Sequence, residues 1–246
     1  MKQKQIQTNF QRIETKYILD RVTLARLEAE MHAYLIPDDY ATSTISNVYF
    51  DNDDFQMIQD SIARRGGREK LRMRTYATEP TKDCQVFLEI KKKSEDVGFK
   101  YRLVSNLTSV VNYIEKGLAD QTISDERVKT EVALLQERYA GLKAKMVISY
   151  DRYSMKGSED KKVRVTVYSN IRFRDYDVDL TSGRHGYPLL EDDMVIMEIM
   201  EIKVPGEYTQ WMSEILNKYG LEDQSFSKYG KAYLKSKELI PQAVKV

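Results

Sequence analysis

Alternation of apolar and polar residues with a period of two most constrains how this chain can fold. Eight segments rich in Val, Ile, Tyr, Phe and Thr show it, at about residues 10–20, 43–51, 68–77, 84–94, 98–105, 144–155, 162–176 and 194–204. Successive side chains of a strand point to opposite faces of a sheet, so this period predicts strands with one buried face. Helical spacing predicts helices over residues 23–35, 109–116, 125–140, 208–219 and 228–236.

Several of these strands follow one another through short connections, and the helices interrupt the strands without alternating with them. This order predicts an α+β fold with an antiparallel sheet and helices outside it. An eight-stranded sheet can remove its edges by closing, so we expect a closed eight-stranded antiparallel β-barrel. Because no Pro/Gly/Ser-rich linker interrupts the chain, we expect a single domain over residues 1–246.

Charged residues occupy every second position in six of the strand segments. They are Arg12, Glu14 and Lys16; Lys70, Arg72 and Arg74; Glu89, Lys91 and Lys93; Lys100 and Arg102; Arg172 and Arg174; Glu201 and Lys203. For any one strand, the simplest interpretation is a face in contact with water. Together the sets are mostly Lys and Arg, although the whole chain holds 39 Lys+Arg against 38 Asp+Glu. The sequence therefore concentrates cations on one face of the sheet.

Cations that face one another across a barrel repel by about 3 kcal/mol per pair at roughly 5 Å and an effective dielectric constant of about 20. A polyvalent anion would relieve this repulsion. The Glu-x-Lys elements Glu14/Lys16, Glu89/Lys91 and Glu201/Lys203 add carboxylates, which bind Mg²⁺ or Mn²⁺ together with phosphate oxygens. The pattern indicates a site for a metal–triphosphate complex.

The composition of the sequence disfavours several other classes of function. The net charge of +1 provides no general basic field for nucleic acid, so we expect no nucleic-acid partner. One cysteine, Cys84, and two histidines, His32 and His185, exclude a disulfide framework and disfavour a histidine-based metal site or a Ser-His-Asp triad. The sequence has no signal peptide and no apolar run long enough to span a membrane, so we expect a cytoplasmic protein.

A series of motifs along the chain carries a family resemblance. In order they are Phe10-Gln-Arg-Ile-Glu-Thr-Lys-Tyr17, Tyr49-Phe-Asp51, Lys70-Leu-Arg-Met-Arg-Thr-Tyr76, Phe87-Leu-Glu-Ile-Lys91, Tyr150-Asp-Arg152, Val163-Arg-Val-Thr-Val167, Glu201-Ile-Lys203 and Ser225-Phe-Ser-Lys-Tyr-Gly230. Together they resemble the VTC domain, the polyphosphate polymerase branch of the CYTH-like triphosphate tunnel enzymes. The resemblance runs from about Phe10 to Leu234.

The resemblance implies a tunnel that binds the triphosphate of ATP with a divalent metal, Mn²⁺ or Mg²⁺, and transfers the γ-phosphate to a growing polyphosphate chain. The residues it places along the phosphate path are Lys16, Arg72, Arg74, Lys91, Arg152, Arg164, Lys203 and Lys228. Further substrate-binding candidates are Arg12, Glu14, Glu89, Lys100, Arg102 and Ser227. Glu201 is the expected metal ligand because it shares a face with Lys203, and a shift of register would exchange it with Glu198.

Arg12 replaces the first acid of the Glu-x-Glu-x-Lys start that is typical of the broader tunnel superfamily. An additional cation in place of a metal ligand favours the binding of a long anion over the activation of water by a metal ion. A polymerase is therefore the leading hypothesis. Phosphoryl transfer needs positioning and charge stabilisation more than a nucleophilic side chain. Two alternatives stay open, namely an inorganic or nucleoside triphosphatase and a non-catalytic module that binds polyphosphate or triphosphate.

Three smaller features lead to modest expectations. The Arg64-Arg-Gly-Gly-Arg68 stretch lacks a phosphate-loop motif and predicts a hairpin turn between strands. Asp51 and the acids that follow it predict a turn with a helix cap. Trp211 and the tyrosines near the C-terminus are typical of packing, and an aromatic residue near the tunnel mouth could hold adenine.

Overall fold

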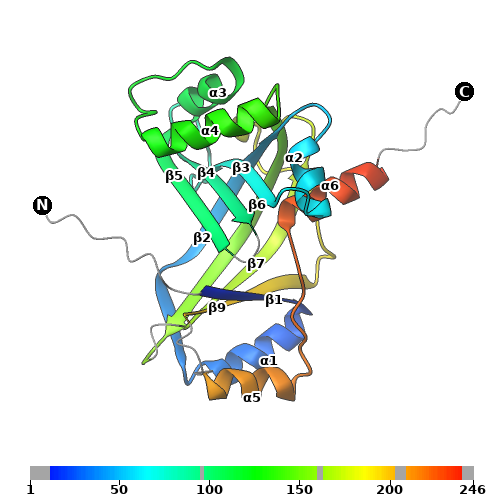
Figure 1. Ribbon diagram of the computed structural model, residues 1–246. Helices are drawn as coiled ribbons and strands as arrows, with labels where there is room; N and C mark the ends of the chain where they lie inside the picture. Colours follow the sequence, from blue (N-terminus) through cyan, green and yellow to red (C-terminus); the bar gives the residue numbers. More distant parts are fainter. Residues whose placement is uncertain (1–11, 95–96, 160–162, 203–208, 240–246) are drawn as a thin grey trace, which may run out of the picture. The chain divides into compact units, whose positions relative to one another are not determined.

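The computed structural model describes residues 12–94, 97–159, 163–202 and 209–239, in which six helices accompany a mostly antiparallel sheet (Figure 1). The strands are β1 (Arg12–Asp20), β2 (Leu35–Asp51), β3 (Arg68–Thr75), β4 (Gln85–Ser94), β5 (Val97–Asn106), β6 (Lys143–Gly157), β7 (Val163–Arg174), β8 (Tyr187–Pro188) and β9 (Met194–Ile202). The helices are α1 (Arg21–Met31), α2 (Gln56–Ala63), α3 (Leu107–Lys116), α4 (Glu126–Arg138), α5 (Gln210–Lys218) and α6 (Lys228–Leu239). The predicted α+β class is confirmed.

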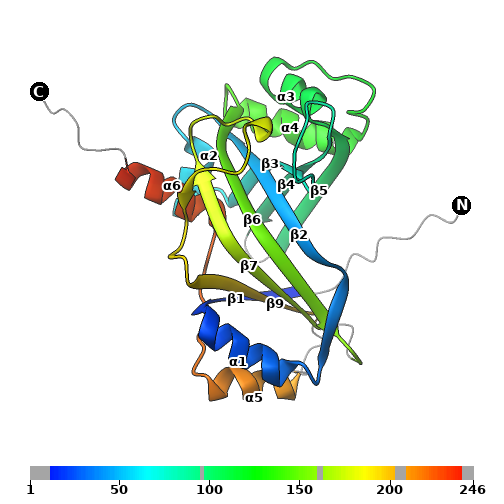
Figure 2. The same ribbon diagram turned by 180° about the vertical axis from the view of Figure 1, so that it is seen from behind.

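The strands pair in the order β1-β9-β7-β6-β2-β3-β4-β5 (Figure 2), and the short β8 pairs with β7. Within the described residues no pairing joins β5 to β1, so the sheet is an open path and the predicted closed barrel is not confirmed. Alternation with a period of two reports which face of each strand is buried. It does not report whether the two end strands meet, because open and closed sheets share that period.

The chain divides into two compact units. The first comprises residues 1–43, 151–169 and 190–225, and the second comprises residues 44–150, 170–189 and 226–246. The chain passes between the units within β2, β6 and β7. The expectation of a single domain stays a prediction.

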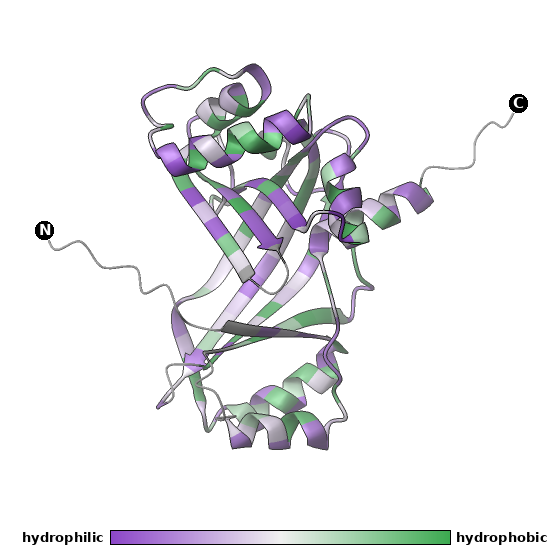
Figure 3. Cartoon of the chain, in the orientation of Figure 1, coloured by the Kyte–Doolittle hydropathy of each residue, from purple (hydrophilic) through white to green (hydrophobic). Residues whose placement is uncertain are grey.

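The core of the second unit lies where α3 and α4 pack on one face of β4 and β5 (Figure 1). Leu71 and Met73 of β3 and Leu88 and Ile90 of β4 are at most 1% exposed on this face. The strands carry alternating hydrophilic and hydrophobic bands (Figure 3). The predicted apolar face is therefore confirmed in this unit, and the charged residues between these positions project to the other face.

The first unit has its own core, built on β1, β7 and β9. Tyr17 and Leu19 of β1 and Met197 of β9 pack with Leu27 of α1 and Met212 of α5. Lys16 lies between core positions of β1, so its side chain projects from the opposite face. Each unit thus pairs one apolar face with one polar face.

Two expectations around α2 had different outcomes. Asp51 accepts hydrogen bonds from the backbone amides of Met57 (2.9 Å) and Ile58 (3.0 Å) at the start of α2, which confirms the helix cap. The hairpin turn at residues 64–68 is wrong, because this stretch joins α2 to β3. Arg64 ends α2 in the left-handed conformation with a φ of 57°, a helix-terminating geometry that spacing alone did not reveal.

In the parts of the chain that are described, no helix combines the length and the apolar character needed to cross a membrane. A cytoplasmic location stays a prediction.

Candidate functional site

The register of β2, β3, β4 and β5 aligns polar residues of the second unit in rows. Tyr49 lies opposite Arg72, Arg72 lies opposite Glu89, and Glu89 lies opposite Arg102. Side chains that are directly opposite on neighbouring strands share a face, with Cβ atoms about 5 Å apart. The register therefore brings a tyrosine, two arginines and a glutamate from four strands into one row.

The next row consists of lysines. Lys70 lies opposite Lys91, and Lys91 lies opposite Lys100. Like charges directly opposite each other destabilise a sheet. On the face of β3, β4 and β5 that holds Glu89, this carboxylate shares the strands with eight cations, namely Arg68, Lys70, Arg72, Arg74, Lys91, Lys93, Lys100 and Arg102. We call this surface the cationic face.

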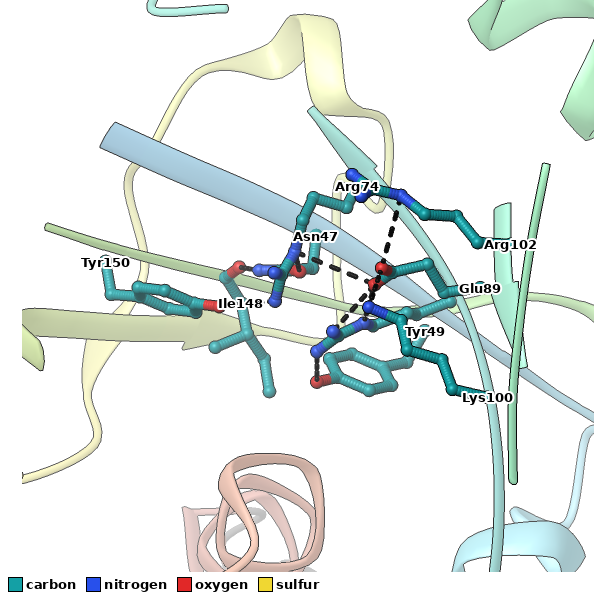
Figure 4. A network of polar contacts seen from close by, with 9 residues as sticks. Asn47, Tyr49, Arg74, Glu89, Lys100, Arg102, Ile148 and Tyr150 are labelled. Carbon is teal, nitrogen blue, oxygen red and sulfur yellow. Dashed lines mark hydrogen bonds and ion pairs between the residues drawn. The ribbon is translucent and has the colours of Figure 1, made fainter. Parts of the chain in front are cut away.

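Glu89 is the centre of the cationic face, and four cations share it (Figure 4). Arg72 donates from Nη2 (2.7 Å) and Nε (2.8 Å) to Oε2, and Lys100 Nζ lies 2.7 Å from Oε1. Arg102 Nε lies 3.5 Å from Oε1, and Arg74 Nε lies 4.0 Å from Oε2. Among the described residues no second carboxylate forms an ion pair with these cations. The cluster carries three positive charges more than its one carboxylate offsets.

Electrostatics keep Glu89 and Arg72 ionised. Burial acts to raise the pKa of Glu89, which is 1% exposed, but the positive charges of Arg72, Arg74 and Lys100 outweigh burial and hold that pKa at about 2. Burial acts to lower the pKa of Arg72, and the nearby oxygens of Tyr49 and Glu89 outweigh it and raise the pKa. The excess positive charge is therefore present at neutral pH.

Neutral oxygens orient the two buried guanidinium groups. Arg74 donates from Nε to Asn47 Oδ1 (2.8 Å) and from Nη2 to the Tyr150 hydroxyl (2.6 Å), and Arg72 Nη1 lies 3.4 Å from the Tyr49 hydroxyl. These partners accept hydrogen bonds without cancelling charge. The pattern of charged residues predicted no role for Asn47, Tyr49 or Tyr150 because these side chains are uncharged, although both tyrosines lie in the quoted motifs.

The start of α6 meets the row of lysines. Lys70 Nζ donates to Ser227 Oγ (2.7 Å), and the same oxygen accepts a hydrogen bond from the Gly230 amide (3.0 Å) in the first turn of α6. Lys228 Nζ lies 5.1 Å from the centre of the Tyr150 ring. Ser227 therefore caps the helix and orients Lys70 at once.

A stacked pair of tyrosines supports this end of the site. The rings of Tyr49 and Tyr229 lie 4.4 Å apart at 17°, and the Tyr229 hydroxyl donates to Asp51 (3.0 Å). Burial raises the pKa of Asp51, and the backbone amides of α2 act in the opposite direction. Asp51 thus links α6 to α2, so its role is structural.

The first unit holds a smaller polar cluster around Lys16. Lys16 Nζ lies 3.5 Å from Glu198 Oε2 and 3.9 Å from Glu14 Oε2, and the register sets Lys16 directly opposite Glu198. The Tyr168 hydroxyl donates to Glu198 Oε1 (3.3 Å). Two carboxylates therefore flank one lysine.

Two predicted arginines of the first unit contact residues that the sequence did not single out. Arg164 pairs with Asp38 (Nη2–Oδ2, 2.5 Å) and donates from Nε to Ser154 Oγ (2.9 Å). Arg152 Nη2 donates to Ser43 Oγ (3.0 Å). Arg164 therefore has a local acid that reduces its net contribution to anion binding.

Some of the predicted residues cannot be placed. The side chains of Arg12 and Glu201 and the whole of Lys203 lie outside the described residues. The backbone of Glu201 pairs with Ile13 and Val163, and Val163 is itself a core residue, whereas Glu198 lies beside Lys16. Glu201 as metal ligand stays a prediction.

Arg172 and Arg174 of β7 have a structural role, so the interpretation of this segment as part of a cationic lining is wrong. Arg174 is fully buried and donates four hydrogen bonds of 2.9 Å to backbone carbonyls of residues 177, 179, 183 and 185. Arg172 Nη1 donates to the carbonyl of Gly186 (3.0 Å). The pair orders the loop between β7 and β8.

A cavity of about 340 Å³ in the second unit includes no residue of the cationic face in its lining. Val48, Met73 and Leu107 line it, so it opens on the apolar face of the sheet, and Lys82 and Asp179 also contribute to its lining. We assign it no part in anion binding.

The fold and the cationic face define a class of α+β protein whose antiparallel sheet carries an excess of cations on one face. Residues 11–237 match the VTC domain family, and the chain belongs to that family. No curated protein matches the chain.

Two solved structures are similar to this chain. A Bacillus halodurans protein ascribed adenylate cyclase activity aligns with a TM-score of 0.54 and 16% identity, over 87% of this chain and 92% of its own. A Vibrio parahaemolyticus protein ascribed the same activity aligns with a TM-score of 0.49 and 10% identity, over 92% of this chain and 98% of its own. At these identities the first likeness supports the fold alone, and the activity of either protein is not carried over.

Proposed function

We propose that this chain is an ATP-dependent polyphosphate polymerase domain, which transfers the γ-phosphate of ATP to the end of a growing polyphosphate chain. The single observation that supports it most is the ratio of four cations to one carboxylate around Glu89. A polyvalent anion supplies the charge that this cluster lacks. Membership of the VTC domain family supports phosphate as that anion.

The side chains suit different parts of a phosphate chain. Arg72 and Arg74 are held in place by neutral oxygens, and a guanidinium group can donate two parallel hydrogen bonds to phosphate. The side chains of Lys100 and Arg102 are 48% and 39% exposed, so they can meet an incoming anion first. We assign binding to the lysines as point charges and clamping to the arginines.

The proposed reaction needs no protein nucleophile. A terminal oxygen of the polyphosphate forms a bond to the γ-phosphorus, the bond from that phosphorus to the β–γ bridging oxygen breaks, and ADP leaves with the electron pair. The attacking oxygen is already anionic, so no base must remove a proton. The cations act by aligning the two anions and by stabilising charge on the equatorial and leaving oxygens.

The residues can hold a divalent metal, Mn²⁺ or Mg²⁺, only if phosphate oxygens of the substrate supply some of its ligands. The described part of the chain contains no group of three or more His, Cys, Asp or Glu that could hold one. Glu14 and Glu198 beside Lys16 offer two carboxylates, and a metal of this kind is usually held by one or two carboxylates together with substrate phosphates. When bound, the ion would neutralise charge on phosphate oxygens.

Incubation with ATP and Mn²⁺, followed by gel analysis of the products, tests the function. We expect polyphosphate and ADP from the wild type and a large loss of polymer from Arg74→Gln. Arg138→Gln is the matched control, because Arg138 pairs with Glu69 and lies outside the cationic face. Free phosphate without polymer would identify a triphosphatase instead, and a bound but intact ligand would identify a binding module.

A further inference from the structure

One end of the cationic face is aromatic. Phe87 lies opposite Arg74 on β3 and opposite Val104 on β5, and Tyr76 follows the end of β3. The rings of Tyr76 and Phe87 meet edge to face, with centres 5.6 Å apart at 78°. Tyr76 is 37% exposed and Val104 is 48% exposed. An exposed apolar patch therefore lies next to the charges.

Arg102 joins this patch to the centre of the cationic face. Its guanidinium carbon lies 3.8 Å from the centre of the Phe87 ring, and its Nε lies 3.5 Å from Glu89 Oε1. Phe87 holds one flat side of the guanidinium group, and the side chain is still 39% exposed. A planar, exposed cation is thus held flat above an aromatic ring.

This arrangement has the chemistry of a nucleobase platform. Bases stack on aromatic rings and on guanidinium planes, and such stacking tolerates any base because every base has a π face. Phe87 and Glu89 are two residues apart on β4, a separation of roughly 7 Å that a ribose can bridge. A base stacked on Arg102 would therefore leave its phosphates among the cations around Glu89.

We propose that Arg102 and Phe87, with Tyr76 beside them, bind the base of a nucleoside triphosphate. This inference rests on the proposed function and adds the recognition of the donor. Inorganic polyphosphate uses the cations alone, whereas a nucleoside triphosphate uses the cations and the platform. The platform therefore gives the site a preference for the phosphate donor over a bare triphosphate.

The test compares two ligands on the full chain by isothermal titration calorimetry, a non-hydrolysable ATP analogue and inorganic tripolyphosphate. We expect the wild type to bind the analogue more tightly. Phe87→Leu keeps an apolar side chain in β4 and should raise the Kd of the analogue about tenfold, or about 1.4 kcal/mol, within the range for one base on one aromatic residue. The Kd of tripolyphosphate should change by less than about twofold, since the cations remain.

Two further variants keep the result interpretable. Tyr76→Ala alters an exposed residue beyond the strand end and should weaken only the ATP analogue, by a smaller factor. Phe99→Leu is the matched control, because Phe99 is a 50% exposed aromatic residue of β5 that lies opposite Lys92 and alternates with Lys100. It should change neither Kd.

Equal affinity of the wild type for both ligands, or an equal loss of both in Phe87→Leu, would overturn the platform. The product gel separates this result from the proposed function. If the protein forms polymer but binds both ligands equally, the proposed base site is refuted and the polymerase proposal stands. If the protein prefers the ATP analogue but forms no polymer, the polymerase proposal alone is refuted. If it binds neither ligand, both proposals are refuted.

Discussion

Glu89→Gln is the most informative single change, because it removes the one negative charge among four cations and nearly preserves shape. The glutamine can still accept a hydrogen bond from Arg72, so the packing of a 1% exposed position is retained. What changes is the charge, from an excess of three positive charges to an excess of four. We expect the ligand-free variant to be less stable than the wild type, and we expect this difference to be smaller when the anion is bound.

The size of the expected stability loss follows from the pKa of Glu89. That pKa is about 2 against an ordinary value of 4.5, and each pKa unit corresponds to about 1.4 kcal/mol, so the ionised carboxylate contributes on the order of 3 kcal/mol. Because the folded-state pKa is depressed, this contribution is present above about pH 4.5 and is lost as the pH falls toward 2. For a domain of this size, 3 kcal/mol lowers Tm by roughly 6–12 °C.

The assay is thermal unfolding at pH 7 with and without tripolyphosphate. Ligand at a hundredfold excess over its Kd stabilises by about 2.7 kcal/mol, and a tenfold tighter Kd would add about 1.4 kcal/mol. We expect the ligand-induced rise in Tm to be larger in Glu89→Gln than in the wild type. The gap in ligand-free stability between the two proteins should narrow as the pH falls below 4.5.

Glu69→Gln is the control. Glu69 is also a buried carboxylate, 7% exposed, and it pairs with Arg138 (2.5 Å) and Lys92 (3.5 Å), but its place in β3 alternates with Lys70 and so it projects to the other face. This variant should lose stability and keep a ligand response of wild-type size. The electrostatic reasoning is refuted if Glu89→Gln is as stable as the wild type without ligand, or if both variants respond equally to tripolyphosphate.

Lys100→Gln should weaken tripolyphosphate binding in calorimetry, and should change ligand-free stability by no more than about 1 kcal/mol in urea unfolding, because the side chain is 48% exposed. Ser227→Ala removes the acceptor for the Gly230 amide and should cost about 1 kcal/mol by urea unfolding, with weaker phosphate binding as Lys70 loses its partner. Glu198→Gln should raise the Mn²⁺ concentration for half-maximal activity, whereas a wild-type Mn²⁺ dependence would argue against Glu198 as a ligand.

Sequence alternation predicted the faces of the central strands correctly, because parity along a strand is a local property. Leu71 and Met73 lie in the core while Arg72 and Arg74 project to the other face, as a period of two requires. The first part of β2 was missed because residues 36–42 are mostly exposed and show no apolar alternation. The helix α2 was missed because eight residues are too short for a clear helical period.

The partners of the charged residues could not be predicted in the same way. Glu89 meets Arg72 and Arg102 because three strands align in one register, and a register is a property of the folded sheet. Arg164 was expected to bind phosphate, yet Asp38 from a distant part of the chain pairs with it. Composition and spacing indicate how many charges share a face, whereas pairing depends on strand register for Glu89 and on a contact across more than a hundred residues for Arg164.

The position of Glu89 also argues for its role. Its two oxygens already accept ion pairs from Arg72 and Lys100 at 2.7 Å, so a metal ion would have to displace those cations and then face the remaining positive charge. Coulomb repulsion between the metal and four neighbouring cations makes that exchange unfavourable. Glu89 is therefore better understood as a positioning residue. It pairs with three guanidinium groups and one ammonium group, and its single charge is too small to neutralise them, which leaves the rest of the charge to be supplied by the proposed phosphate ligand.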